Sequence, residues 1–176
     1  MLKPTFAAFS CASLLLSFSA AQACDAEKFV LSAGRAFTVA SHSGSASAFA
    51  SAANNYADMR GIALFALGPH RKELPPGKES EFVRMAQGFM GRFMSRYASR
   101  FNAAGMAVTG CSGNVINAQA GGRKLIFRVA KRGSGFVLQD VNVSSIWLAG
   151  QMRSTFTGVI NRNGGDINAL WDYLKG

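Results

Sequence analysis

The sequence is poor in acidic side chains, with nine Asp and Glu against nineteen Lys and Arg in 176 residues. Charged residues make up only 16% of the chain, below the share of about 25% that is usual for soluble domains. Its two histidines, His42 and His70, are isolated, and no cluster of His, Cys, Asp or Glu has the spacing of metal ligands. We therefore expect no metal site and no metal cofactor.

Catalytic motifs are also missing. No serine sits in a nucleophile elbow, and no glycine-rich loop precedes a helix as a phosphate cradle would. Most of the carboxylates fall at predicted helix starts or in loops, where capping and solvent account for them. Asp140 alone is expected to face the interior. The sequence therefore predicts a protein that is not an enzyme, and an isomerase-like enzyme with Asp140 as general base stays as the alternative.

The formal net charge of +10 favours an anionic partner. No basic run is interleaved with aromatic residues as in a stacking platform for nucleic acid, so we expect no nucleic-acid partner and favour anionic membranes.

The first 23 residues have the pattern of a signal peptide. Lys3 precedes an apolar run at residues 6–18, which is too short to span a bilayer, and an Ala-x-Ala cleavage site follows at residues 21–23. We expect residues 1–23 to be removed and residues 24–176 to form one exported domain. An uncleaved anchor helix and a lipoprotein acylated at Cys24 are the alternatives. After cleavage Cys24 and Cys111 remain, and in an oxidising compartment they are candidates for a disulfide.

The order of the predicted elements indicates the α+β class. Helical patterns at residues 25–39, 48–56, 58–66 and 80–103 come first, strands follow at residues 106–118, 123–131 and 135–143, and a further helix covers residues 148–160. We expect N-terminal helices and one long helix packed on an antiparallel sheet of about three to four strands. The last strand changes parity between Leu138 and Val141, which predicts a β-bulge near Gln139 and Asp140 and hence a bent sheet.

The residues around this bent strand also resemble a known family. Phe136, the run Gln139-Asp140-Val141, Trp147-Leu148, Arg153-Ser154 and Phe156, together with residues 58–68, are similar to the signature of the toluene-tolerance/MlaC family. Its members are periplasmic phospholipid-binding proteins, auxiliary components of an ABC-type lipid transport system that maintains outer-membrane lipid asymmetry.

This resemblance implies a fold and a function. The fold is a nuclear-transport-factor-like cone with a lipid cavity, and the function is that of a monomeric shuttle. It would carry phospholipid between an inner-membrane ABC-type complex and an outer-membrane lipoprotein/porin complex, with no cofactor. Related proteins are associated with hopanoids, and a Pro-His-Arg run follows Gly68 where many members have Trp, so the lipid class stays open. A periplasmic adaptor without a ligand is a further alternative.

A soluble lipid carrier must hide acyl chains from water. We expect an apolar slot on the order of 1,000 Å³, near the upper end of ordinary pockets. Asp140 and Arg153 are expected to form a structural ion pair that fixes a helix against the bent sheet. The residues expected to bind the lipid are apolar side chains of the helices and strands: Phe65, Phe82, Met85, Phe89, Phe93, Leu125, Phe127, Val129, Phe136, Leu138, Trp147, Met152 and Phe156.

Overall fold

The computed structural model describes residues 24–176, so the predicted signal peptide lies outside the described residues. In chain order the elements are α1 (Glu27–Ser43), α2 (Ala46–Tyr56), α3 (Met59–Ala66), the 3₁₀ helix η1 (Gly68–Glu73), α4 (Glu79–Arg96), the 3₁₀ helix η2 (Ala98–Phe101), β1 (Ala107–Ser112), β2 (Val115–Ala120), β3 (Arg123–Arg132), β4 (Gly135–Val143), β5 (Ile146–Trp147), α5 (Leu148–Arg162) and α6 (Asn168–Lys175). The α+β class is confirmed. None of the helices in residues 24–176 has both the length and the apolar character that crossing a bilayer requires.

The strands form one antiparallel sheet in the order β1-β2-β3-β4-β5, so each strand pairs with the next one in the chain. The sheet has five strands where three to four were expected. The segment at residues 106–118 is a hairpin of two strands rather than one strand, because Gly113 adopts a positive φ of 58° and reverses the chain. The two-residue strand β5 is too short for a sequence pattern to reveal.

The predicted bulge in β4 is confirmed. Arg128 of β3 lies opposite Asp140, but the next residue, Val129, lies opposite Leu138, so Gln139 is the extra residue. The extra residue reverses the alternation of β4. As a result, Leu138 before the bulge and Val143 after it belong to the same buried cluster.

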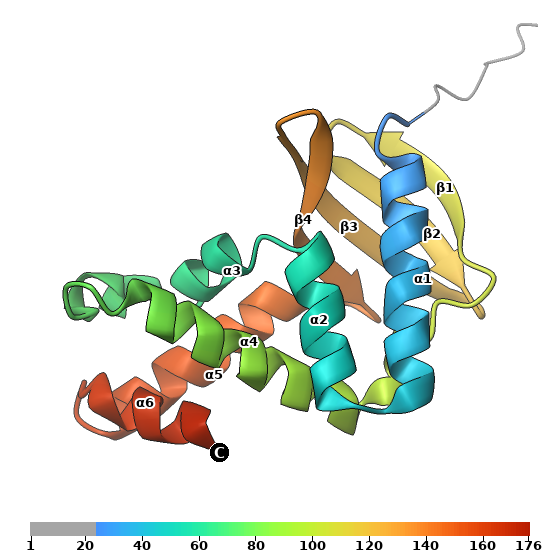
Figure 1. Ribbon diagram of the computed structural model, residues 1–176. Helices are drawn as coiled ribbons and strands as arrows, with labels where there is room; N and C mark the ends of the chain where they lie inside the picture. Colours follow the sequence, from blue (N-terminus) through green and yellow to red (C-terminus); the bar gives the residue numbers. More distant parts are fainter. Residues whose placement is uncertain (1–23) are drawn as a thin grey trace, which may run out of the picture.

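Two hydrophobic cores share the molecule. One, the sheet core, contains the inner face of the sheet and the buried side of α1, including Val30, Ile116 and Phe127. The other, the helical core, contains side chains of α2 to α6, including Phe82 and Phe156. Figure 1 shows α1 lying across the sheet, while α4, α5 and α6 stack on one another farther away from it. The two cores meet between the sheet and the helices, where Phe37, Ala57 and Phe101 pack against both.

The long helix is shorter than expected. The helical pattern extends to residue 103, but α4 ends at Arg96 and the chain continues as η2. This change of path brings Phe101 to the boundary, where it packs against both cores. Gly91 of α4 faces α2 so closely that a Cβ there would collide with the carbonyl oxygen of Ala46.

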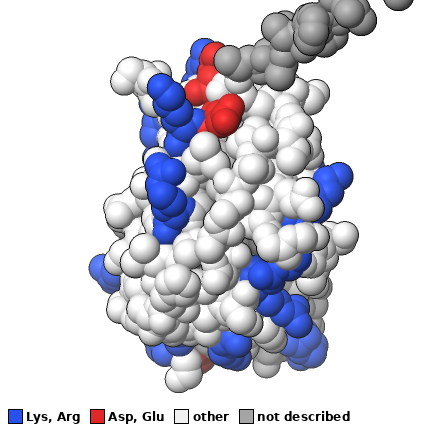
Figure 2. Space-filling model, turned by 90° about the vertical axis from the view of Figure 1, so that its right-hand side faces the viewer, with Lys and Arg blue, Asp and Glu red and all other residues white. Residues whose placement is uncertain are grey.

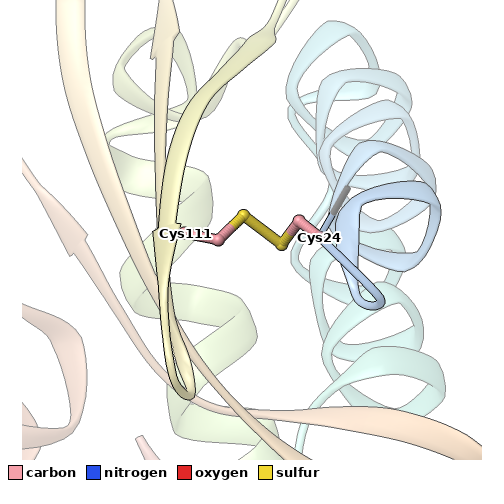
Figure 3. Close-up of a disulfide and its surroundings, with 2 residues drawn as sticks. All are labelled: Cys24 and Cys111. Carbon is pink, nitrogen blue, oxygen red and sulfur yellow. A yellow bond between two sulfur atoms is a disulfide. The ribbon is translucent and has the colours of Figure 1, made fainter. Parts of the chain in front are cut away.

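A disulfide between Cys24 and Cys111 joins the turn before α1 to β1, with the two Cα atoms 5.9 Å apart (Figure 3). The bond ties the N-terminal end of α1 to the edge strand of the sheet. It thus lies within the part of the molecule that holds the sheet core.

Candidate functional site

An apolar cavity lies between the inner face of the sheet and the helices. Its volume is about 70 Å³. The sheet contributes Leu125, Phe127, Leu138, Asp140, Val141 and Val143, the helices contribute Phe37, Ala53, Ala57, Met59, Ile62, Met90, Met94, Leu148 and Ala149, and the segment that follows α4 contributes residues 100–103. The walls therefore come from both cores, and the cavity lies at their boundary.

The bulge in β4 builds one wall of this cavity. In a regular strand, Leu138 and Val141 would face opposite sides of the sheet. With Gln139 inserted, Leu138, Val141 and Val143 all line the cavity. One extra residue thus gives β4 a continuous apolar surface towards the helices.

Asp140 is buried at this bend, with 8% of its surface exposed. Its Oδ1 atom accepts a hydrogen bond of 2.8 Å from the backbone N–H of Val141 and one of 2.9 Å from the backbone N–H of Ala149. Ala149 is in the first turn of α5, which has no capping side chain of its own. Asp140 therefore caps α5 from the neighbouring strand.

The pKa of the Asp140 carboxyl is raised above its ordinary value because burial disfavours the charged form. The backbone N–H groups of Ala149 and Val141 and the guanidinium group of Arg128 oppose this effect. Arg128 lies directly opposite Asp140 on β3, and its guanidinium carbon is 3.9 Å from the ring centre of Trp147. The carboxylate thus accepts two backbone hydrogen bonds and lies in the field of the positive charge of Arg128.

The expected ion pair between Asp140 and Arg153 is wrong. None of the ion pairs between described residues joins them. Arg153 is exposed on α5, and its guanidinium carbon lies 4.9 Å from the ring centre of Phe65. The bulge directs Asp140 to the backbone at the start of α5, about one helical turn before Arg153, and this explains the difference.

Three of the residues expected to bind lipid line the cavity, namely Leu125, Phe127 and Leu138. Phe82, Phe89, Met152 and Phe156 are instead buried in the helical core, and Met85 packs on that core. The rings of Phe89 and Phe156 meet edge to face, with centres 5.2 Å apart. These side chains hold helices together and do not reach the cavity.

The remaining expected residues lie at other places. Val129 and Phe136 line a separate hollow beside the disulfide. Phe93 lines a groove next to the cavity. Trp147 lies under Arg128, and Phe65 is 48% exposed beneath Arg153.

Sequence reasoning missed Met90 and Met94 as cavity residues, although both belong to the apolar side of α4. They are four positions apart and therefore share one side of the helix, whereas Phe82 and Phe89 share another. The wide apolar stripe of α4 thus packs into the helical core with one part and lines the cavity with the other. A signal was present in the residue types, since flexible methionines suit a surface that adapts to a ligand.

The cavity is much smaller than expected. A volume of about 70 Å³ compares with the expected slot on the order of 1,000 Å³. Phe101, Met90 and Met94 line the cavity and pack in or against the helical core. Within residues 24–176 no group of three His, Cys, Asp or Glu side chains is arranged to hold a metal ion.

A comparison with solved structures identifies a similar fold. A phospholipid-binding protein from Ralstonia solanacearum, solved in complex with a phospholipid, matches with a TM-score of 0.66 and 18% sequence identity. The match covers 86% of this chain and 96% of that one. A search of curated proteins gives no match.

A comparison with family profiles is decisive because it covers most of the chain. The profile described as MlaC protein matches residues 30–176, from the first turns of α1 to the last residue. The matched segment contains the bulge and every wall of the cavity. The chain belongs to the MlaC protein family.

Proposed function

We propose that this protein binds phospholipid, with the acyl chains held between the sheet and the helices. The observation that carries the proposal is the apolar cavity at the boundary of the two cores, in a chain of the MlaC family. The similar fold of the Ralstonia protein that was solved with a phospholipid supports it. The role is binding rather than catalysis, since the one carboxylate in the cavity wall already caps a helix.

We further propose that the protein acts in the periplasm as a monomeric shuttle. It takes lipid from an inner-membrane ABC-type transport complex or delivers lipid to it, and it exchanges lipid with an outer-membrane lipoprotein/porin complex. Transferring the roughly 15 methylenes of a C16 chain into water costs on the order of 12 kcal/mol, at about 0.8 kcal/mol per CH₂. A carrier removes this cost by covering the chain.

Loading requires the cavity to widen. Ordinary ligand sites have volumes of about 300–1,000 Å³, and the cavity measures about 70 Å³. Phe37, Ala57 and Phe101 are partly buried and pack against both cores, so they are side chains that must shift when the cavity widens. Burial of acyl chains in the widened cavity offsets the cost of opening it.

The direct test is to purify the protein from cells, extract it with organic solvent and identify bound lipid by mass spectrometry. We expect glycerophospholipid in a fixed ratio to protein, and the masses separate it from hopanoid. Protein that stays monodisperse but carries no lipid, even after incubation with phospholipid vesicles, would contradict the proposal and favour an adaptor.

A further inference from the structure

A second hollow adjoins the cavity where η2 faces the β4–β5 turn. This hollow, here called the η2 groove, has a volume of about 300 Å³. It shares Arg100, Phe101, Val143 and Leu148 with the cavity. Its outer part is lined by Tyr97 and Ile146, which are 43% and 44% exposed, and by Phe93, Ser144 and Gln151. The η2 groove therefore adjoins the cavity at the surface, and its lining combines apolar and polar side chains.

The η2 groove has positive charge and no described acidic side chain in its lining. The guanidinium carbon of Arg100 lies 5.3 Å from the ring centre of Tyr97. Arg123 of β3 donates hydrogen bonds of 3.4 Å to the backbone carbonyls of Ser99 and Arg100, which places a second guanidinium group against η2. Among the ion pairs of residues 24–176, none involves Arg100, Arg123 or the neighbouring Lys124.

Another hollow that adjoins the cavity carries acidic side chains in its lining. A hollow of about 270 Å³ on the other side shares Ile62, Asp140 and Ala149 with the cavity, and its lining includes the carboxylates of Asp58 and Asp140. Its one lining cation, Arg128, lies over Trp147, and Arg132 nearby is paired with Asp58. An anionic group is disfavoured there and favoured at the η2 groove.

The wider surface is consistent with anionic ligands. Figure 2 shows basic side chains spread over the side of β1 and α1, with the acidic ones gathered near the start of the described chain. This widely spread positive charge attracts anions from a distance. The η2 groove, in contrast, places Arg100 directly beside the apolar cavity.

We propose that the η2 groove is the headgroup site for a diacyl phospholipid, with its phosphate at Arg100, and with Arg123, which lines the hollow beyond η2, adding positive charge nearby. The inference rests on the proposed function, because the tails of the same lipid occupy the widened cavity. An amphiphile needs apolar walls for its chains beside a cation for its headgroup. The cavity provides the walls, and Arg100, which lines both the cavity and the groove, provides the cation. The guanidinium group of Arg100 suits phosphate because a guanidinium group can donate two parallel hydrogen bonds. Phe101 and Leu148 separate the groove from the cavity and must move aside for the chains to pass.

The test is a competition between two lipids that differ only in the headgroup. The protein is incubated with vesicles that contain equal amounts of dioleoylphosphatidylglycerol and dioleoylglycerol, separated from them, extracted and analysed by mass spectrometry. We expect the protein to prefer the phospholipid. In the variant Arg100→Gln/Arg123→Gln the bound ratio of phospholipid to dioleoylglycerol should fall at least about tenfold, the effect expected from losing a single charge-assisted hydrogen bond, while total bound lipid persists.

The control variant is Arg71→Gln/Lys72→Gln, which removes two exposed charges from η1, far from the groove. It should keep the wild-type ratio. Because Arg123 also holds η2, the single variant Arg100→Gln is measured too and should lower the ratio by itself.

Two results would overturn the headgroup site while leaving lipid binding intact. One is an unchanged ratio in both arginine variants, with normal total lipid. The other is calorimetric binding of inorganic phosphate that depends on Arg100 but is accompanied by an unchanged lipid ratio, since the groove would then serve a free anion. If the wild-type protein takes up neither lipid, the proposed function itself fails together with this inference.

Discussion

Phe127 lies in the middle of the cavity wall on β3 and is 4% exposed. Replacing Phe127 by Glu puts a carboxylate against apolar walls, where an unpaired charge is strongly disfavoured. We expect the variant Phe127→Glu to lose lipid uptake from phospholipid vesicles, as measured by mass spectrometry of the extracted protein. The control is Phe65→Glu, because Phe65 is exposed and does not line the cavity.

Phe127→Glu is also expected to weaken the fold, so a second variant is needed that separates loss of lipid binding from loss of stability. Ala53 of α2 lines the cavity and is 3% exposed, and Ala53→Leu fills the space without adding a polar group. We expect reduced lipid uptake at an unchanged or higher melting temperature. Wild-type uptake by a folded Ala53→Leu variant would remove the cavity from the lipid path.

Asp140 gives a pH-dependent prediction. Its pKa is raised by burial, so this carboxyl binds a proton more tightly in the folded chain than in the unfolded chain. Its contribution to stability is therefore fully present below the unfolded pKa and is lost as the pH rises through the folded pKa. The free energy of unfolding of the wild type, relative to Asp140→Asn, should increase as the pH is lowered from 7 into the ordinary carboxyl range. Urea denaturation at several pH values measures this difference, and a flat or decreasing difference would contradict the assignment.

At the scale of elements, α4 carries two glycines with different surroundings. A Cβ at Gly91 would collide with the carbonyl oxygen of Ala46 on α2, whereas a Cβ at Gly88 would meet only the end of the flexible Arg92 side chain. We expect Gly91→Ala to destabilise the protein by roughly 1–3 kcal/mol through the clash. Gly88→Ala should stabilise it by up to about 1 kcal/mol, because alanine favours the helix. Thermal denaturation of the pair checks this, and equal shifts would show that α2 and α4 do not meet at Gly91.

The same helix shows what a sequence can and cannot predict here. The class, the antiparallel sheet and the bulge at Gln139 all follow from local patterns, because alternation and periodicity are properties of neighbouring residues. The division of the α4 stripe between Phe89, which faces helices, and Met90, which faces the cavity, depends on where α2, α5 and the sheet lie. Those partners are distant in sequence, and so the stripe predicted an apolar surface without predicting its two functions.

The capping role of Asp140 was hidden for a similar reason. Its partner is a backbone N–H group of Ala149, and a backbone group leaves no mark in the sequence. A charged side chain such as Arg153 is visible, and it was therefore the partner that the sequence suggested. Phe101 was missed as a boundary residue because the change from α4 to η2 has no glycine or proline to signal it.

For the whole molecule, the disulfide links positions 87 residues apart and ties α1 to the sheet. Closing a loop of this length restricts the unfolded chain and stabilises the fold by about 4–5 kcal/mol. We expect Cys24→Ser/Cys111→Ser to lower the melting temperature by roughly 10–15 °C. Lipid uptake at 25 °C should persist, because the hollow beside the disulfide shares no residue with the cavity. A calorimetric scan combined with lipid extraction separates the two effects, and loss of uptake in a folded variant would mean that α1 must stay tied for loading.

The shape of the cavity depends on the one extra residue of the β4 bulge, Gln139. Without Gln139, the outward and inward positions after it would exchange places, and Val141 and Val143 would turn their methyl groups to the solvent face. The cavity would then lose Val141 and Val143 from its lining, although every hydrophobic residue remained in the chain. Deleting Gln139, a polar and exposed residue, is thus expected to disrupt the cavity although no apolar side chain is removed.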